Sequence, residues 1–364
     1  MKRYEKFVLE AEKGIIFEVS EGTSGELIIR ALNIATDNVY SENNIETTNV
    51  GFNLQAVSAG EYAEVLSVYT DNDGNKAVVP PGWTVSGICK ENTIWGKDVS
   101  LVIYRIPKEK VSGINWEDMD VVEGLKITFD QLVWVPVGLL DANGTLDGEH
   151  FSEKFGRRTY MNYEFSDEEF NEALSDELIK QIESVKKYGG FYISRYNISR
   201  NYYGKPQSVK DVMPWRNINF YDAKKIAATI EDNEAVKSHL TFGAEYDSVL
   251  EWFIKTEVKT LAEIAEDSTE WGNHWNIENS PRDLVETGNR EKWCANNIYD
   301  LAGNVDEWTQ EQNGSSGRVI RGGNFYNNGN IFPVASRIHF LPTFNYWFTG
   351  FRATLYIKWT TWHC

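Results

Sequence analysis

The chain contains few cysteines and no cluster of histidines, and both scarcities limit its chemistry. Its 364 residues include three cysteines, Cys89, Cys294 and Cys364, which are far apart and odd in number. A disulfide framework or a clustered zinc site is therefore not expected, although the count allows one bridge. None of the five histidines stands three or four residues from another. A helix therefore cannot present two imidazole ligands on one face.

Long apolar runs and an excess of basic charge are also missing. No apolar run is long enough to span a bilayer, and residues 1–14 lack the apolar core of a secretory signal. We expect a chain made in the cytoplasm, without membrane insertion. If it works outside a cell, it must leave by assembly into a particle or by lysis. The net charge of -18 repels phosphate backbones, which argues against nucleic acid as a partner. The carboxylates suit calcium, or they serve solubility alone.

Aromatic side chains are abundant where these other groups are scarce. The chain has 13 Trp, 18 Tyr and 18 Phe. Buried aromatics supply large core areas, and exposed aromatics make adhesive surfaces. The length allows two or three domains with a sizeable core.

The N-terminal part is predicted to be β-rich. Residues 14–19 and 25–30 are short β-branched segments bounded by turn formers, and residues 71–75 form a turn cluster. We therefore predict an N-terminal β-rich module over residues 1–75. Residues 76–128 continue in the same style as a β-rich connecting segment that belongs to either neighbour.

Helical signals follow, and strands return after them. Residues 166–169 form a capping box that predicts a helix ending at Tyr188, before Gly189. Asn219 is the predicted cap of a helix over 221–230, and Thr241 caps a third. The third has an apolar face made of Tyr246, Val249, Leu250 and Phe253. Strands at both ends with helices between them predict an α+β domain over residues 129–364.

Seven short strings in this domain occur in the order found in one known family. They lie at residues 129–137, 189–196, 214–223, 240–252, 297–309, 321–323 and 350–352. In this order they resemble the formylglycine-generating-enzyme (sulfatase-modifying factor) superfamily. The resemblance implies a C-type lectin fold of that type, preceded by the β-rich module. It also implies that the first and last strands, 133–137 and 352–357, pair with each other.

The enzymatic branches of this superfamily need residues that this chain lacks. Copper-dependent members use two cysteines shortly after the Arg-Gly-Gly motif, whereas residues 321–337 contain none. Copper(I) needs such soft thiolate ligands. Iron-dependent members that form sulfoxides use clustered histidines, which are also missing. The comparison predicts a chain that is not an enzyme, with no catalytic residues and no catalytic cofactor.

The C-terminal segment resembles a third branch, the variable proteins of diversity-generating retroelements, which include viral and prophage members. The resemblance implies that adenine-directed mutagenesis rewrites codons in a variable region at about 321–352. Scaffold residues alternate there with Asn and aromatic residues, the composition of a paratope. The candidate displayed positions are Asn324, Tyr326, Asn327, Asn330, Ile331, Phe332, Ile338, His339, Phe340, Leu341, Phe344, Asn345, Tyr346, Trp347 and Phe348. In the alternative interpretation, Phe344, Tyr346 and Phe348 face a core as alternate residues of an ordinary strand.

A candidate calcium site follows from the same resemblance. The family often binds calcium near the turn that corresponds to residues 303–308. The implied ligands are the Asn304 and Glu307 side chains and the Val305 carbonyl, holding a structural ion. The alternative is a solvated acidic turn capped by Asn304.

Together these features predict a non-enzymatic display protein. Its C-terminal lectin-fold surface would bind varied macromolecular partners, above all proteins on a host or cell surface. The alternatives are an oxidase of the formylglycine-generating type and a carbohydrate-binding or structural particle protein of fixed specificity. Sugar binding does not follow from the fold name.

Overall fold

The computed structural model describes residues 7–11, 15–21, 27–33, 54–137, 170–171, 175–313 and 317–358. The chain divides into two compact units, residues 1–53 and 54–364. The first contains the antiparallel sheet β1-β2-β3, formed by β1 (Phe7–Ala11), β2 (Ile15–Glu21) and β3 (Leu27–Asn33). The strands predicted near residues 14–19 and 25–30 are thereby confirmed.

The second unit is built around a six-stranded antiparallel sheet with the order β14-β21-β11-β9-β8-β7. Its strands are β7 (Thr84–Val85), β8 (Val102–Tyr104), β9 (Gln131–Pro136), β11 (Gly190–Ser194), β14 (Val236–Leu240) and β21 (Ala353–Ile357). Every residue of β9, β11 and β21 is buried. A strand covered on both faces has a continuous apolar run, which explains the sequence of residues 129–137.

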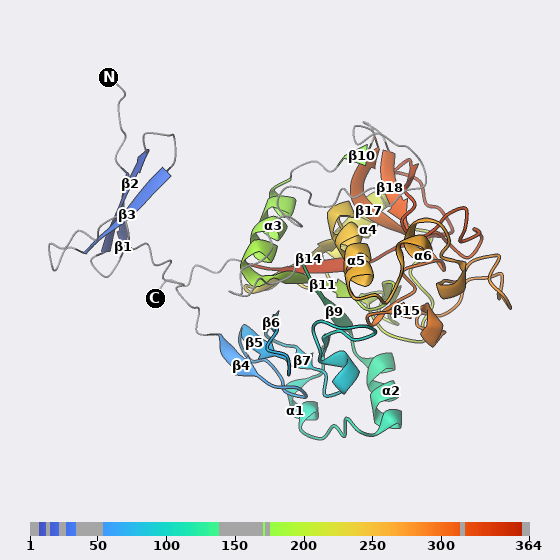
Figure 1. Cartoon of the computed structure of the whole chain (residues 1–364), viewed down its shortest axis with the longest axis horizontal. Coiled ribbons are helices and arrows are strands. Elements are labelled where there is room, and N and C mark those ends of the chain that lie inside the picture. The colour runs from blue at the N-terminus through green and yellow to red at the C-terminus, as the bar shows by residue number, and fades with distance from the viewer. Residues whose placement is uncertain are drawn as a thin grey trace. The chain divides into compact units, whose positions relative to one another are not determined.

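Alternate residues of the central strands face two different cores. Val133 and Val135 pack in one core with the helix α5 (Gly243–Lys255). Leu132 and Trp134 pack in another with β4 (Gln55–Val57), β5 (Ser67–Thr70) and β6 (Lys76–Val79). Figure 1 shows β9, β11 and β14 between this small sheet and the strands β17 and β18.

The predicted pairing of the first and last strands of the domain is wrong. β11 lies between them, because Tyr192 pairs with Trp134 of β9 on one side and with Leu355 of β21 on the other. All five residues of β11 are buried, so this strand takes a central place.

The division between the two units falls at residues 53 and 54, whereas the sequence placed a boundary at residue 75. The turn at 71–75 joins β5 and β6, which pair from Ser67–Val79 to Thr70–Lys76. Asp71 Oδ1 holds this turn by accepting from the backbone N–H groups of Asp73 (3.0 Å) and Asn75 (2.9 Å). In addition, β8 pairs with β9. Residues 54–128 are therefore part of the same compact unit as residues 129–358.

A second sheet carries most of the C-terminal segment. It contains β10 (Phe170–Asn171), β17 (Asp306–Asn313), β18 (Gly317–Arg321) and β19 (Ile338–Phe340), in that order. β20 (Thr349–Phe351) pairs with β17 in parallel. The shorter strands are β12 (Ser199–Arg200), β13 (Pro206–Gln207), β15 (Cys294–Ala295) and β16 (Ile298–Tyr299).

The helices agree with the predictions except at two N-termini and at the C-terminus of α4, which ends at Ala227 rather than at residue 230. α4 (Phe220–Ala227) begins after Asn219, whose Oδ1 accepts from the Asp222 N–H at 2.9 Å, as predicted. α5 begins after Phe242 rather than Thr241, and its predicted apolar face is buried. α3 (Asp176–Tyr188) ends as predicted at Gly189, which has a φ of 83°, but its cap is Ser175. Residues 170–171 form β10, so no helix continues through them from the capping box at 166–169, which lies outside the described residues.

The remaining helices of the described residues are α-helices and 3-10 helices. The former are α1 (Lys108–Val111), α2 (Met119–Thr128) and α6 (Leu261–Ala265), and the latter are Cys89–Glu91, Thr269–Trp271 and Glu291–Trp293. Within the ranges given above, no helix has the length and apolarity needed to cross a bilayer.

Candidate binding surface

The predicted displayed positions lie almost entirely on the surface. All of them except Asn324 are exposed or half-buried. Most of the residues between them are buried, among them Ala335, Ser336 and Arg337, and residues 350–352 that follow them are buried as well. The segment thus alternates between buried anchors and surface side chains, as expected of a scaffold that presents a surface.

Asn324 supports this surface from below. Its Nδ2 donates to Asp306 Oδ2 at 2.5 Å, and its Oδ1 accepts from the Tyr326 N–H at 2.8 Å. The Asp306 N–H in turn donates to the Phe348 carbonyl at 3.1 Å. Burial raises the pKa of Asp306 to about 7. Asp306 therefore contacts both ends of the predicted variable segment, Asn324 through its side chain and Phe348 through its backbone.

Aromatic rings form a continuous chain of contacts along the surface. Ring centroids lie 5.4 Å apart for Trp275 and Tyr326, 5.7 Å for Tyr326 and Trp347, and 5.4 Å for Trp347 and Phe348. The ring centroids of Phe348 and Tyr346 lie 5.8 Å apart, and Tyr346 also contacts the rings of Phe340 and Phe344. We call this set the aromatic face; it comprises Trp275, Tyr326, Phe340, Phe344, Tyr346, Trp347 and Phe348.

The aromatic face is not a regular strand. Residues 341–348 lie between β19 and β20 and have no strand assignment, and Phe344 is 56% exposed. Tyr346 and Phe348 are half-buried and pack against the core around Trp308 and Phe351. The alternative interpretation of residues 344–348 as an ordinary strand therefore does not describe this segment, although two of its three aromatics also touch the core.

Buried ion pairs fix the scaffold beneath the aromatic face. Arg337 Nε lies 2.9 Å from Glu311 Oε1, and Arg337 also pairs with Asp247. Arg321 Nη2 lies 2.6 Å from the other Asp247 oxygen. These side chains join the variable segment and β18 to α5 and β17. Arg337 is the one Lys, Arg, Asp or Glu within residues 322–349, so the surface of this segment presents no formal charge of these types.

Two of the implied calcium ligands, the Asn304 and Glu307 side chains, already have protein hydrogen-bond partners. Asn304 Oδ1 accepts from Asn273 Nδ2 (3.0 Å) and from the Val285 N–H (3.2 Å). Glu307 Oε1 accepts from Arg352 Nε at 2.7 Å. The Arg352 guanidinium thus supplies the positive charge that calcium would bring to Glu307. This arrangement does not fit a calcium ion held jointly by Asn304 and Glu307, and the described residues contain no group of three or more acidic, His or Cys side chains placed for a metal.

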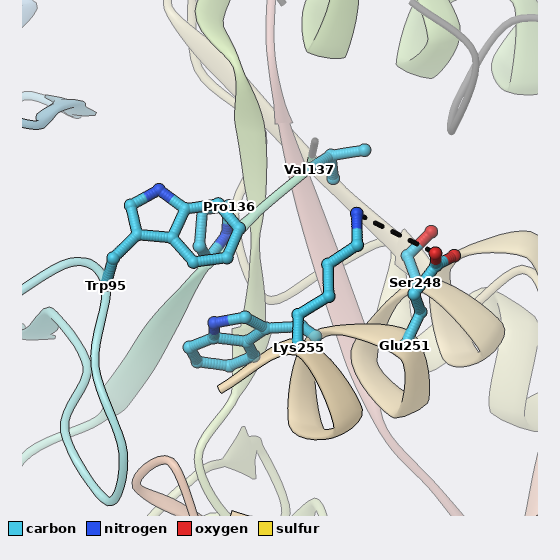
Figure 2. A pocket seen from close by; sticks show the side chains of 7 residues that line it. Trp95, Pro136, Val137, Ser248, Glu251 and Lys255 are labelled. Atoms are coloured by element: carbon cyan, nitrogen blue, oxygen red, sulfur yellow. Dashed lines mark ion pairs between the residues drawn. The ribbon is translucent and has the colours of Figure 1, made fainter. Parts of the chain in front are cut away.

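The two described cysteines, Cys89 and Cys294, form no disulfide, and neither lines the pocket shown in Figure 2. Cys89 is exposed, burial raises the pKa of the Cys294 thiol to about 12, and Cys364 lies outside the described residues. Figure 2 shows a pocket between Trp95, Pro136 and α5. Its volume is ≈ 10 Å³, and Lys255 Nζ lies 3.7 Å from Glu251 Oε1 at its edge. This volume holds about one water molecule. Two open hollows, of ≈ 450 and ≈ 420 Å³, are lined by neither histidine nor cysteine.

Several residues that border the aromatic face were missed by the sequence analysis. Trp275 belongs to the aromatic face itself, and the Arg282 guanidinium lies over its ring, 4.9 Å from the ring centroid. Arg216 Nη1 donates to the Trp347 carbonyl (3.1 Å), and Asn219 Nδ2 donates to Asn345 Oδ1 (3.0 Å). These residues lie far from the C-terminal segment in sequence. Only their contacts in the folded chain reveal them.

No curated protein matches the chain. The solved structures that are similar to the chain include three of low identity. They are Treponema denticola variable protein 1 (17% identity, 46% of this chain and 84% of that one, TM-score 0.33), CarF (15%, 46% and 87%, 0.32) and PvdO from Pseudomonas aeruginosa (14%, 64% and 95%, 0.36).

A family model supplies the assignment. Residues 117–356 match the family described as "Sulfatase-modifying factor enzyme 1-like domain". This match and the mixed helix-and-sheet architecture confirm the predicted fold class. The chain belongs to the sulfatase-modifying factor enzyme 1-like domain family.

Proposed function

We propose that this chain is a non-enzymatic binding protein that presents the aromatic face and its neighbouring surface positions to a macromolecular partner. The observation that carries the proposal is the continuous, uncharged aromatic face on a buried ionic scaffold. Interface cores are depleted in charge and rich in Tyr, Trp and Phe. Rigid aromatic side chains lose little conformational entropy on binding.

The finer proposal is that a retroelement diversifies this surface so that it binds varied proteins on a host or cell surface. It rests on the resemblance of residues 318–357 to variable proteins and on the alternation of surface positions with buried anchors. A viral or prophage origin and display on a virion or a cell surface belong to the same proposal.

The alternatives receive less support from the described residues. An oxidase of the formylglycine-generating type needs paired thiolates near residues 321–337, and no cysteine stands there. A binder or structural particle component of fixed specificity would use the same aromatic face. It differs from the proposal in having uniform codons at the surface positions.

Selection of binding peptides tests the binding function directly. A random peptide library is selected on the full-length protein, and the selected peptides are measured against a face variant, Tyr326→Ser/Phe344→Ser/Trp347→Ser. The matched control, Val65→Ser/Met119→Ser/Leu261→Ser, removes three side chains of similar exposure elsewhere. The peptides should lose binding to the face variant and keep it with the control. Equal binding to both variants would contradict the proposal.

A further inference from the structure

Residues 200–225 differ in charge from the chain as a whole. They contain six basic and two acidic residues, within a chain whose net charge is -18. Lys210 is paired with Glu123 at 2.6 Å. Arg200, Lys205 and Arg216 are exposed, and among the described residues no carboxylate lies within ion-pair distance of them. We call residues 200–225 the basic flank.

The basic flank borders the aromatic face along residues 342–347. Besides the two side-chain contacts of Arg216 and Asn219, the Phe220 N–H donates to the Pro342 carbonyl at 3.1 Å. Ile218 forms a bridge with Tyr346. These backbone contacts do not depend on the identity of the surface side chains, so the flank stays beside the face even if those side chains vary.

The flank presents its own adhesive side chains on a well-defined turn. Tyr202 and Tyr203, at the tip of the β12–β13 hairpin, are 97% and 83% exposed, with ring centroids 5.5 Å apart. Asn201 Oδ1 holds the tip by accepting from the Tyr203 and Lys205 N–H groups, both at 2.9 Å. At the base of the hairpin, Arg200 lies over the Trp215 ring, 5.1 Å from its centroid. Exposed tyrosines beside arginine are the composition of a contact surface.

We infer that the basic flank is a constant docking element that selects partners with an acidic protein surface beside the patch that meets the aromatic face. This inference rests on the proposed binding function and names the charge of its partner. Complementary charge at the rim of an interface orients the partner and speeds association.

The acidic segment that follows Trp275 favours a protein over an extended polyanion as the partner. Trp275 begins a segment that carries Glu278, Asp283 and Glu286, with Arg282 as its one cation up to residue 286. Trp275 reaches the face through Tyr326, whereas the basic flank reaches it through residues 342–347. A nucleic acid strand that ran from the basic flank across the aromatic face would come to the carboxylates of this acidic segment. A protein surface with a local acidic patch could contact the basic flank without reaching those carboxylates.

The test compares peptides selected on three full-length proteins: wild type, the flank variant Arg200→Glu/Lys205→Glu/Lys225→Glu, and the control Lys76→Glu/Lys97→Glu/Lys180→Glu. All six residues are exposed, so both variants should fold, which circular dichroism checks. Peptides selected on wild type should be enriched in Asp and Glu relative to the starting library. They should bind the flank variant about tenfold more weakly, and the control as tightly as wild type.

The outcomes separate the two proposals. Peptides that require Tyr326 and Trp347 but lack acidic enrichment, or that bind flank and control variants equally, overturn the docking inference alone. Peptides that ignore the aromatic face overturn the proposed function. The remaining comparison uses fluorescein-labelled oligothymidylate. If wild type binds this probe more tightly than it binds the selected peptides, the basic flank is a nucleic-acid site instead.

Discussion

Asp306 and Asn324 are joined by a buried hydrogen bond of 2.5 Å between Asp306 Oδ2 and Asn324 Nδ2. The bond connects β17 to the start of the predicted variable segment, and the Asp306 backbone reaches the end of that segment at Phe348. The order of the surface therefore depends on a polar pair that is itself buried.

Replacing Asn324 should destabilise the fold. Asn324→Ala leaves the Asp306 carboxyl buried without its donor, which costs about 1–3 kcal/mol of unfolding free energy. Urea denaturation followed by circular dichroism measures this loss. Asn327→Ala, at a half-buried position nearby, serves as the control and should change the value by less than about 0.5 kcal/mol. Equal effects of the two substitutions would contradict the supporting role of Asn324.

Asp306 should also make stability depend on pH. Its folded pKa of about 7 lies above its usual value of 3.8, so the folded state holds the proton more tightly than the unfolded state. The contribution is fully present below pH 3.8 and is lost as pH rises through 7, at about 1.4 kcal/mol per pH unit. Asp306→Asn should remove this slope. Urea midpoints at pH 5 and pH 7 measure it, and an unchanged slope in the variant would rule out Asp306 as the source.

His274 should change stability with pH in the direction opposite to that of Asp306. Burial lowers its pKa to about 4, so the unfolded state takes up a proton more readily than the folded state. Its contribution is present above pH 6.5 and is lost as pH falls through 4. His274→Gln should therefore lower the slope of stability against pH between pH 4 and 6.5. The same denaturation series measures it, and an unchanged slope in His274→Gln would contradict this role of His274.

The buried ion pairs predict that a single substitution causes a large loss of unfolding free energy. Arg337→Met leaves Asp247 and Glu311 with one cation fewer in a buried site, which costs about 3–5 kcal/mol. Arg200→Met, on the exposed hairpin, should cost less than about 0.5 kcal/mol. Thermal and urea unfolding of both variants provide the comparison. A small loss in Arg337→Met would mean that the network does not hold the scaffold.

The contacts of Glu307 predict how the protein responds to calcium. Because Arg352 already pairs with Glu307, the melting temperature should be the same in millimolar calcium and in a chelator. A calcium-dependent rise that Glu307→Gln abolishes would restore the calcium site implied by the family resemblance.

Local sequence signals predicted much of the fold because they act over a few residues. The Asn219 cap, the Gly189 terminus of α3 and the buried face of α5 each follow from neighbouring side chains. Strand order could not be predicted in this way. The place of β11 between β9 and β21 depends on pairing between residues more than 50 positions apart.

The candidate surface was predictable only in its C-terminal part. Alternation of aromatics and amides with small residues indicated the displayed positions between residues 324 and 348. All of these predicted positions except Asn324 lie at the surface. Trp275 and the basic flank join this surface through long-range contacts that leave no local pattern. Asn324 looked like its neighbours in sequence, but its burial follows from the position of Asp306 below it.

Deep sequencing of the 3′ end of the gene tests the central claim most directly, together with a search nearby for a reverse transcriptase and an imperfect copy of that end. The account predicts substitutions at adenines of the copy, concentrated in codons for exposed positions such as Tyr326, Phe344 and Trp347. Codons for the buried anchors Arg337, Gly350 and Arg352 should stay constant. A uniform 3′ end with no copy and no reverse transcriptase, or variation spread equally over anchors and surface positions, would contradict diversified display and leave a binder of fixed specificity.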